Sequence, residues 1–195
     1  MVPFPHQPID VRWTPWVEPG IEHLRLTITD HGILADGAIV SVWDGEPARL
    51  RYRIRCDAAW RVRSVRIGSL GTGGARVHLD ADGEGRWTDE TGARVPTLDG
   101  CLDVDIAATP FTNTLPIRRL GLRPGDRRDI AVAYVAVPGL AVSREPQRYE
   151  CIEARADGAR HRFTALDGGF TTELPTDADG MVEDYPLLFR RVWQR

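Results

Sequence analysis

Two aspartates in one short segment are the side chains of this chain with the clearest potential for chemistry. Asp103 and Asp105 lie in the run LDGCLDVDIAATPFTNTLPIRRL, which spans residues 98–120. If the segment begins as a strand, the two share a face and lie roughly 6.5–7 Å apart. Carboxyl groups about 6.5–9.5 Å apart suit the acid and base of an inverting glycosidase. The same carboxylates could instead accept hydrogen bonds from sugar hydroxyls or pair with arginines of a neighbouring strand.

Neutral hydrogen-bonding side chains and an arginine pair follow the two aspartates. Thr112 and Asn113 supply hydroxyl and amide groups, and Arg118 and Arg119 come shortly after them. This combination could hold a sugar or phosphate head group, or it could be a loop that caps itself through its own side chains. Trp87, in the segment GRWTD, offers an aromatic face for a ligand, with core packing as the alternative.

A stripe of arginines is the second charged feature. Alternation predicts two strands, 48–56 and 60–67, that form a hairpin around Asp57, with a phase shift that indicates a bulge near Arg63-Ser64. The polar face of this hairpin would carry guanidinium groups, which need acidic neighbours, counterions or an anionic partner. The stripe is either a solvated face with scattered salt bridges or an interaction module for an acidic partner. Its members are Arg49, Arg51, Arg53, Arg55, Arg61 and Arg63.

Motifs for other chemistry are missing from the sequence. The five histidines show no HxH or HExxH spacing, and the three cysteines form no CxxC pair. There is no GxSxG elbow, and the glycine-rich run 68–74 leads into a strand rather than a helix. We therefore expect no cofactor, no metal site and no catalytic residue.

The elements that must position these residues are short strands separated by Gly/Asp turns. Hydrophobic alternation with a period of two predicts an all-β fold, a twisted antiparallel sheet that curls into an open or barrel-like single domain over residues 1–195. One or two short helices are the most we expect, with 107–120 as the place for one, limited by Pro110 and Pro116. We expect the proline-rich residues 1–20 to be irregular, and a turn or bulge at Asp36-Gly37. The predicted strands are 21–28, 32–43, 48–56, 60–67, 75–80, 85–89, 101–106, 129–137, 148–155, 159–166, 169–174 and 187–193.

Composition restricts the partners and the compartment. The chain has 195 residues, a net charge of −3 and 25 basic residues that are all arginine, which gives no electrostatic argument for nucleic acid. No apolar run approaches the ~20 residues of a membrane span, and the first residues lack the pattern of a signal peptide. Unpaired cysteines favour a reducing compartment. We expect a cytoplasmic protein, and the oligomeric state stays open.

The central run also carries a resemblance. DGCLDVDIAATPFTNTLPIRRL resembles the signature of the putative glycolipid-binding family, a bacterial group long classed as a domain of unknown function. Tyr134, Tyr149, Phe163, Tyr185-Pro186 and Phe189 are similar to its flanking elements. The resemblance implies a β-rich domain similar in outline to carriers that shelter acyl chains, and it implies no catalytic residue.

Our leading hypothesis is therefore a non-catalytic protein that binds a glycolipid or another amphiphilic small molecule. Leu102, Val104 and Ile106 would line an apolar cavity, and polar side chains at its rim would meet the head group. A hydrolase that uses Asp103 and Asp105 on a glycoconjugate, and the arginine-faced interaction module, are the alternatives. The candidate ligand-binding residues are Asp103, Asp105, Thr112, Asn113, Arg118, Arg119 and Trp87.

Overall fold

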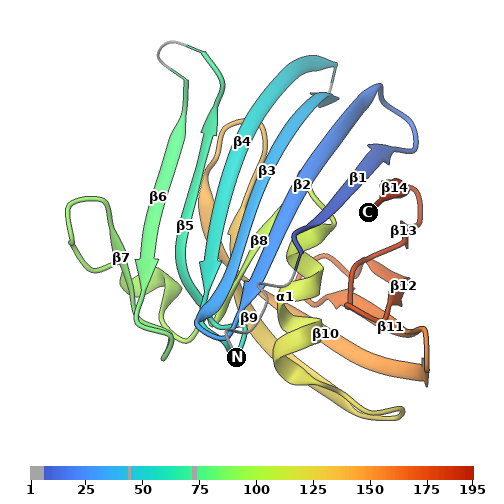
Figure 1. Cartoon of the computed structure of the whole chain (residues 1–195). Helices are drawn as coiled ribbons and strands as arrows, with labels where there is room; N and C mark the ends of the chain where they lie inside the picture. Colours follow the sequence, from blue (N-terminus) through green and yellow to red (C-terminus); the bar gives the residue numbers. More distant parts are fainter. Residues whose placement is uncertain (1–6, 44, 72–73) are drawn as a thin grey trace, which may run out of the picture.

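Two β-sheets curl around one helix in the computed structural model of the chain, which describes residues 7–43, 45–71 and 74–195 (Figure 1). The larger sheet contains β1 (Ile9–Pro15), β2 (Gly20–Thr29), β3 (Gly32–Trp43), β4 (Glu46–Cys56), β5 (Val62–Ser69), β6 (Arg76–Ala81), β7 (Trp87–Asp89), β13 (Asp184–Tyr185) and β14 (Phe189–Gln194). The smaller contains β8 (Asp103–Ile106), β9 (Arg127–Val135), β10 (Val142–Arg155), β11 (Gly158–Ala165) and β12 (Thr171–Asp177). A 3₁₀ turn, η1 (Pro96–Leu98), precedes β8, and α1 (Phe111–Leu120) follows it.

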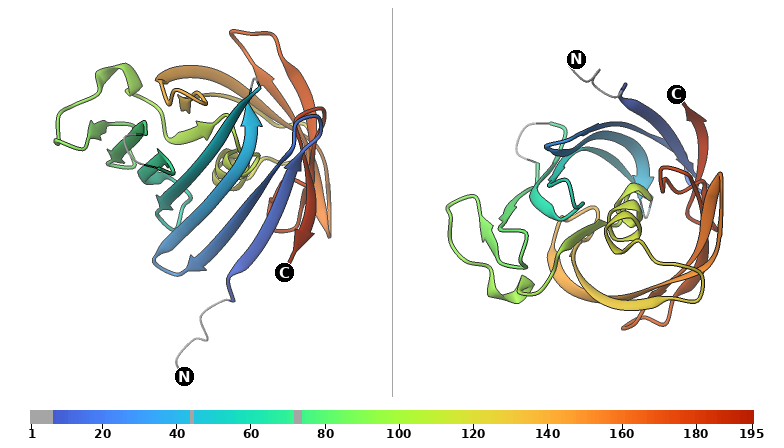
Figure 2. Two further views of the ribbon diagram at one scale, coloured as in Figure 1. Left: turned by 90° about the horizontal axis from the view of Figure 1, so that it is seen from above. Right: turned by 60° about the horizontal axis from the view of Figure 1, so that its bottom comes forward.

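The fold is all-β, and its strand order is simple. The larger sheet runs β13-β14-β1-β2-β3-β4-β5-β6-β7, and the smaller runs β12-β11-β10-β9-β8. Neighbouring strands are antiparallel apart from β8 and β9, which pair in parallel. A parallel pair needs a crossover connection, and α1 supplies most of it. The helix therefore lies inside the ring of strands, as the right-hand view of Figure 2 shows.

Alternation along β2 to β5 explains why the larger sheet has one dry face. Leu24, Leu26 and Ile54 are fully buried and point inward, whereas the arginines between them point outward. Tyr52 belongs to the inward row and lies across Gly37 of β3, where an added Cβ would be 2.1 Å from the tyrosine ring. The core thus lies between this face, α1 and the smaller sheet.

Helix α1 forms in spite of Pro116 in its interior. Every residue from 111 to 117 is buried, so packing offsets the hydrogen bond that this proline removes. The Thr109 hydroxyl accepts a hydrogen bond from the Phe111 N–H (3.0 Å) at the first turn. Gly121 ends the helix in the left-handed region, with φ of 54°. The expected self-capping loop is therefore the buried first turn of a helix.

Most predicted strands are confirmed, and three local expectations need comment. The bulge near Arg63 is confirmed, because Arg55 pairs with Ser64 and Cys56 with Val62. The turn or bulge at residues 36–37 was wrong, because β3 runs through them without a register shift. The irregular start was wrong for residues 9–15, which pair as β1 with β2 and β14. Residues 1–6 of the same expected segment lie outside the described residues.

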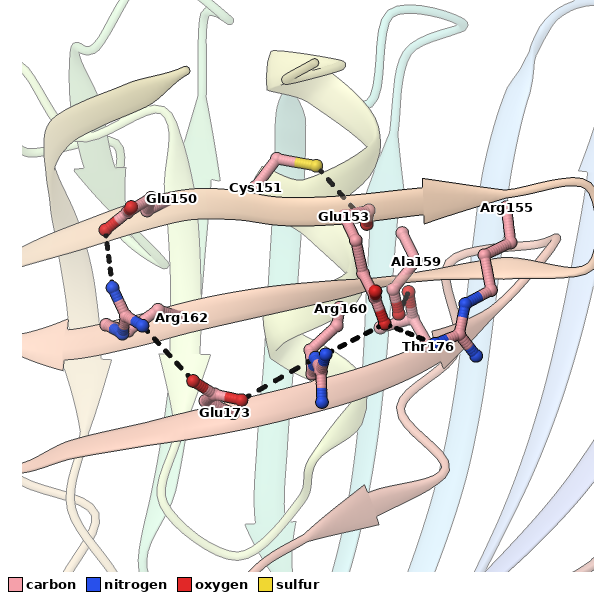
Figure 3. A network of polar contacts seen from close by, with 9 residues as sticks. All are labelled: Glu150, Cys151, Glu153, Arg155, Ala159, Arg160, Arg162, Glu173 and Thr176. Atoms are coloured by element: carbon pink, nitrogen blue, oxygen red, sulfur yellow. Dashed lines mark hydrogen bonds and ion pairs between the residues drawn. The ribbon is translucent and has the colours of Figure 1, made fainter. Parts of the chain in front are cut away.

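An ion-pair row covers the outer face of β10, β11 and β12 (Figure 3). Arg162 bridges Glu150 (3.1 Å) and Glu173 (3.2 Å). Arg160 continues the row from Glu173 to Glu153 (3.0 Å). Glu153 reaches this face because the register shift between Cys151 and Glu153 places it opposite Arg160. The row alternates in sign, so the face satisfies its own charges.

No helix in the described part of the chain combines the length and the apolar character needed to cross a bilayer.

Candidate functional site

A pocket of about 500 Å³ opens where the two sheets and the first turn of α1 meet. Its walls come from the end of β3, the end of β8 with the loop after it, strands β9 to β11, and the β13–β14 region. Its aromatic wall is formed by Trp43, Tyr134, Phe163, Phe170, Tyr185 and Phe189. Its other polar or charged members are Asp105, Thr109, Asn113, Glu145, Gln147 and Asp167.

Four rings of the aromatic wall, those of Phe163, Phe170, Tyr185 and Phe189, form a connected set. Phe163 contacts Phe170 and Tyr185, each at a centroid distance of 6.3 Å, and Tyr185 contacts Phe189 at 6.3 Å. These distances are within the range of favourable edge and tilted ring pairs. Burial raises the pKa of Tyr185, so its hydroxyl stays protonated and can donate a hydrogen bond.

The polar floor of the pocket consists of Asp105, Asn113 and Gln147, and Thr112 and Tyr149 hold these side chains from behind. The Thr112 hydroxyl donates to Asp105 Oδ1 (2.9 Å), and Gln147 Nε2 donates to Asp105 Oδ2 (2.6 Å). The Tyr149 hydroxyl donates to Asn113 Oδ1 (2.9 Å). Burial raises the pKa of Asp105, and the hydrogen bonds from Gln147 and Thr112 oppose that rise. The floor is pre-organised, because each of these side chains is held by another.

Two polar contacts fix α1 against β8. The helix returns antiparallel to the strand, so Thr112 in its first turn meets Asp105, and Arg119 in its last turn meets Asp103. Arg119 binds Asp103 through Nε (2.9 Å) and Nη2 (2.5 Å), and Asp103 is 0 % exposed. Burial raises the pKa of Asp103, with Arg119 opposing it. The central motif thus serves to dock the helix as well as to line the pocket.

Comparison with known families identifies this architecture. The family model described as "Putative glycolipid-binding" matches residues 10–191. The chain belongs to this family. A crystal structure of a DUF1089 family protein from Pseudomonas aeruginosa is similar to it, with a TM-score of 0.78 and 38% sequence identity over 88% of this chain and 92% of that chain. No curated protein matches the chain. All described residues of the pocket lie within the part that matches the putative glycolipid-binding family.

The sequence-predicted site residues of this family member separate into two groups. Asp105 and Asn113 line the pocket, and Thr112 lies behind Asp105 as its hydrogen-bond donor. Asp103 and Arg119 pair with each other away from the pocket. The two aspartates therefore share a strand face but no cleft.

The remaining two predicted residues lie elsewhere. The Arg118 guanidinium stacks over the Trp60 ring, at 5.2 Å from its centroid, on the exposed side of α1. Trp87 is 0 % exposed and donates from Nε1 to the Cys101 carbonyl oxygen (2.9 Å). Neither lines the pocket, because α1 turns Arg118 outward and the start of β7 faces the core.

Two of the three residues predicted to line an apolar cavity do not line the pocket. Val104 and Ile106 are each 0 % exposed in the core, and of the three predicted residues only Ile106 lines the pocket. Leu102 borders a separate surface depression together with Arg119. The wall is aromatic instead, and it is built from strands that are distant in the sequence.

Sequence reasoning missed most of the aromatic wall and Gln147. A signal existed in the resemblance to the putative glycolipid-binding family, since Tyr134, Phe163, Tyr185 and Phe189 belong to its flanking elements. The missing information was that β9, β11, β13 and β14 bring these rings to one place.

The arginine stripe lies outside this site, on the outer face of β4 and β5. Asp36 of β3 accepts hydrogen bonds from Arg51 Nη2 (3.0 Å) and Arg53 Nη2 (2.6 Å). An acidic neighbour therefore neutralises part of the stripe, which was one of the expected ways to balance it.

Proposed function

We propose that this protein is a non-catalytic binding protein for a glycolipid or another amphiphilic small molecule, held in the pocket between the two sheets. The observation that carries this proposal is the pairing of an aromatic wall with a pre-organised polar floor in a pocket of about 500 Å³. Ligand sites of this kind are concave, mostly apolar and fitted with a few fixed polar groups, and they range over about 300–1,000 Å³.

The polar end of the ligand belongs at the floor in this proposal, which reverses the expected arrangement with the head group at the rim. Asn113 and Gln147 are each 3 % exposed, so their amides lie deep in the pocket. Aromatic rings cover the sides and the mouth, where Phe170 is 40 % exposed and can contact an alkyl chain.

A hydrolase that uses Asp103 and Asp105 gains no support from this geometry. An acid and a base must both reach the substrate, and Asp103 is fully buried against Arg119. The second alternative is a module that binds an acidic partner through the arginine stripe. The stripe is present on β4 and β5, but nothing among its described residues indicates a particular partner.

The test is direct detection of the ligand, followed by blocking the pocket. The purified full chain is extracted with organic solvent, and the extract is analysed by mass spectrometry. The protein is then titrated with n-decyl glucoside while the fluorescence of its tryptophans, including Trp43 at the pocket, is recorded. We expect Ala165→Phe, which fills the pocket from β11, to weaken binding by about tenfold or more, because an added ring removes room for the ligand.

Thr164→Phe is the matched control. Thr164 is the preceding residue of β11 and points to the opposite face, where its hydroxyl contacts Thr171 (3.2 Å). The control adds a similar bulk without entering the pocket, so it keeps wild-type affinity. A lipid-free extract, together with no saturable binding of the glucoside or of decyl amphiphiles with charged head groups to the wild type, would refute the proposal.

A further inference from the structure

Among the described residues Asp105 has no cationic partner, in contrast to Asp103, Asp10 and Asp177, three other poorly exposed aspartates. Arg119 pairs with Asp103, Arg25 with Asp10, and Arg191 with Asp177. Within the described ranges, no arginine or histidine forms an ion pair with Asp105, although the chain contains 25 arginines. The two donors on Asp105, Thr112 and Gln147, are both neutral. Asp105 is half-buried. A carboxylate that loses part of its hydration without gaining a counter-charge is costly, so its presence in a pocket needs an explanation.

The rest of the pocket has the same sign. Glu145 and Asp167 are the other ionisable acids that line it, and the described lining residues include neither arginine nor histidine. Tyr134 of β9 is the register partner of Asp105. Burial and, after it, the carboxylates of Asp105 and Glu145 raise the pKa of the Tyr134 hydroxyl. A phosphate, sulfate or carboxylate head group would be repelled here.

The aromatic wall favours the opposite charge. Rings such as Phe163, Phe170 and Tyr185 present negative faces that attract a cation within about 6 Å of the centroid. Proteins recognise quaternary ammonium groups with cages of aromatic rings, and a carboxylate can add a charge-assisted contact to an ammonium that carries N–H groups. A neutral sugar could hydrogen-bond to the floor, but it would leave the charge of Asp105 uncompensated.

We infer that the preferred ligand of the pocket is an amphiphile whose polar end carries an ammonium group, paired with Asp105 and enclosed by the aromatic wall. This inference rests on the proposed function and specifies its ligand class. The ammonium supplies a positive counter-charge to Asp105, as Arg119 does to Asp103 two residues earlier on the same strand face.

The experiment compares three probes of equal chain length: n-decylammonium, n-decyl glucoside and n-decyl sulfate, each below its micellar concentration. Binding to the full chain is measured by isothermal titration calorimetry. We expect n-decylammonium to bind at least about tenfold more tightly than the glucoside, and the sulfate to bind most weakly, as a charge-assisted contact in a partly dry site implies.

Asp105→Asn is the deciding variant, because it keeps the shape of the side chain and removes its charge. We expect it to weaken n-decylammonium by about tenfold while the glucoside changes by less than about threefold. Glu145→Gln, at a second half-buried acid that lines the pocket, should give a smaller loss and does not alter Asp105. Asp99→Asn, whose carboxylate pairs with Arg94 away from the pocket, makes the same change in net charge and should leave all three affinities unaltered.

The outcomes separate the inference from the proposed function. Wild-type protein that binds the glucoside as tightly as the ammonium, or an Asp105→Asn variant that keeps the ammonium preference, overturns the inference alone. If none of the three probes binds to the wild type, the proposed function itself fails.

Discussion

At the scale of single residues, Glu22 is a buried carboxylic acid whose ionised form the core disfavours. Glu22 is 3 % exposed, and its Oε1 accepts hydrogen bonds from the Tyr52 hydroxyl (2.5 Å) and the Thr109 hydroxyl (2.7 Å). Its Oε2 has no hydrogen-bond partner among the residues that the structure describes. Burial raises the pKa of Glu22 from 4.5 to about 7. Tyr52 reaches Glu22 because Gly37 leaves room for its ring on β3.

Glu22 should therefore make stability depend on pH. Its folded-state pKa lies above the unfolded value, so its contribution is fully present below about pH 4.5 and is lost as the pH rises through about 7. The shift corresponds to at most about 3 kcal/mol of unfolding free energy. We expect Glu22→Gln to match the wild type near pH 5 and to be more stable by about 2–3 kcal/mol near pH 8, measured by urea unfolding.

Taking the difference between variant and wild type at each pH cancels most contributions of other titrating groups. Glu18→Gln, in the exposed turn between β1 and β2, serves as the control and should follow the wild-type profile. Parallel pH profiles for Glu22→Gln and the wild type would show that Glu22 is not the group responsible.

At the scale of elements, the β8–α1 unit depends on a buried ion pair. The Arg119 side chain is 13% exposed and Asp103 is buried, so solvent screens this pair little. We expect Arg119→Ala to lower the unfolding free energy by about 3–5 kcal/mol, because it leaves a buried carboxylate without its partner. Guanidinium unfolding of the variant measures this loss.

A double variant that replaces both members of the pair tests whether the loss comes from the unpaired charge. Asp103→Leu combined with Arg119→Met removes both charges at similar volume, so it should recover most of the stability that Arg119→Ala loses. A double variant as unstable as the single one would mean that the ion pair has a positioning role beyond charge compensation.

At the scale of the whole molecule, the pocket couples the two sheets. Trp43 and Phe189 come from the larger sheet, whereas Phe163 and Gln147 come from the smaller one. A ligand that contacts both binds the folded protein only. At a free concentration of 100 times Kd it should stabilise the fold by about 2.7 kcal/mol and raise Tm by about 5–10 °C. Thermal unfolding with the tightest-binding decyl probe measures the shift, which should disappear in Ala165→Phe; a shift of equal size in that variant would place the binding site elsewhere.

Local patterns in the sequence were sufficient for most of the fold. The β4–β5 hairpin and its bulge at Arg63 could be predicted because side-chain alternation depends on neighbouring residues alone. The first strand was missed because its proline-rich surroundings hid the alternation of Val11 and Trp13, both buried. The parallel pairing of β8 with β9 depends on the path that α1 takes between the two strands. No local sequence pattern specifies this path.

The sequence by itself determined the all-β class, the family and the segment that carries the polar floor. Only the tertiary structure decided what each aspartate of that segment does. Asp103 and Asp105 are the same residue type on the same face of one strand, so no local property separates them. The antiparallel return of α1 brings Arg119 to Asp103, whereas Asp105 receives Gln147 from β10 and opens to the pocket. Their different environments arise from contacts between residues far apart in the chain, which is why alternation could identify the pair but could not assign the roles.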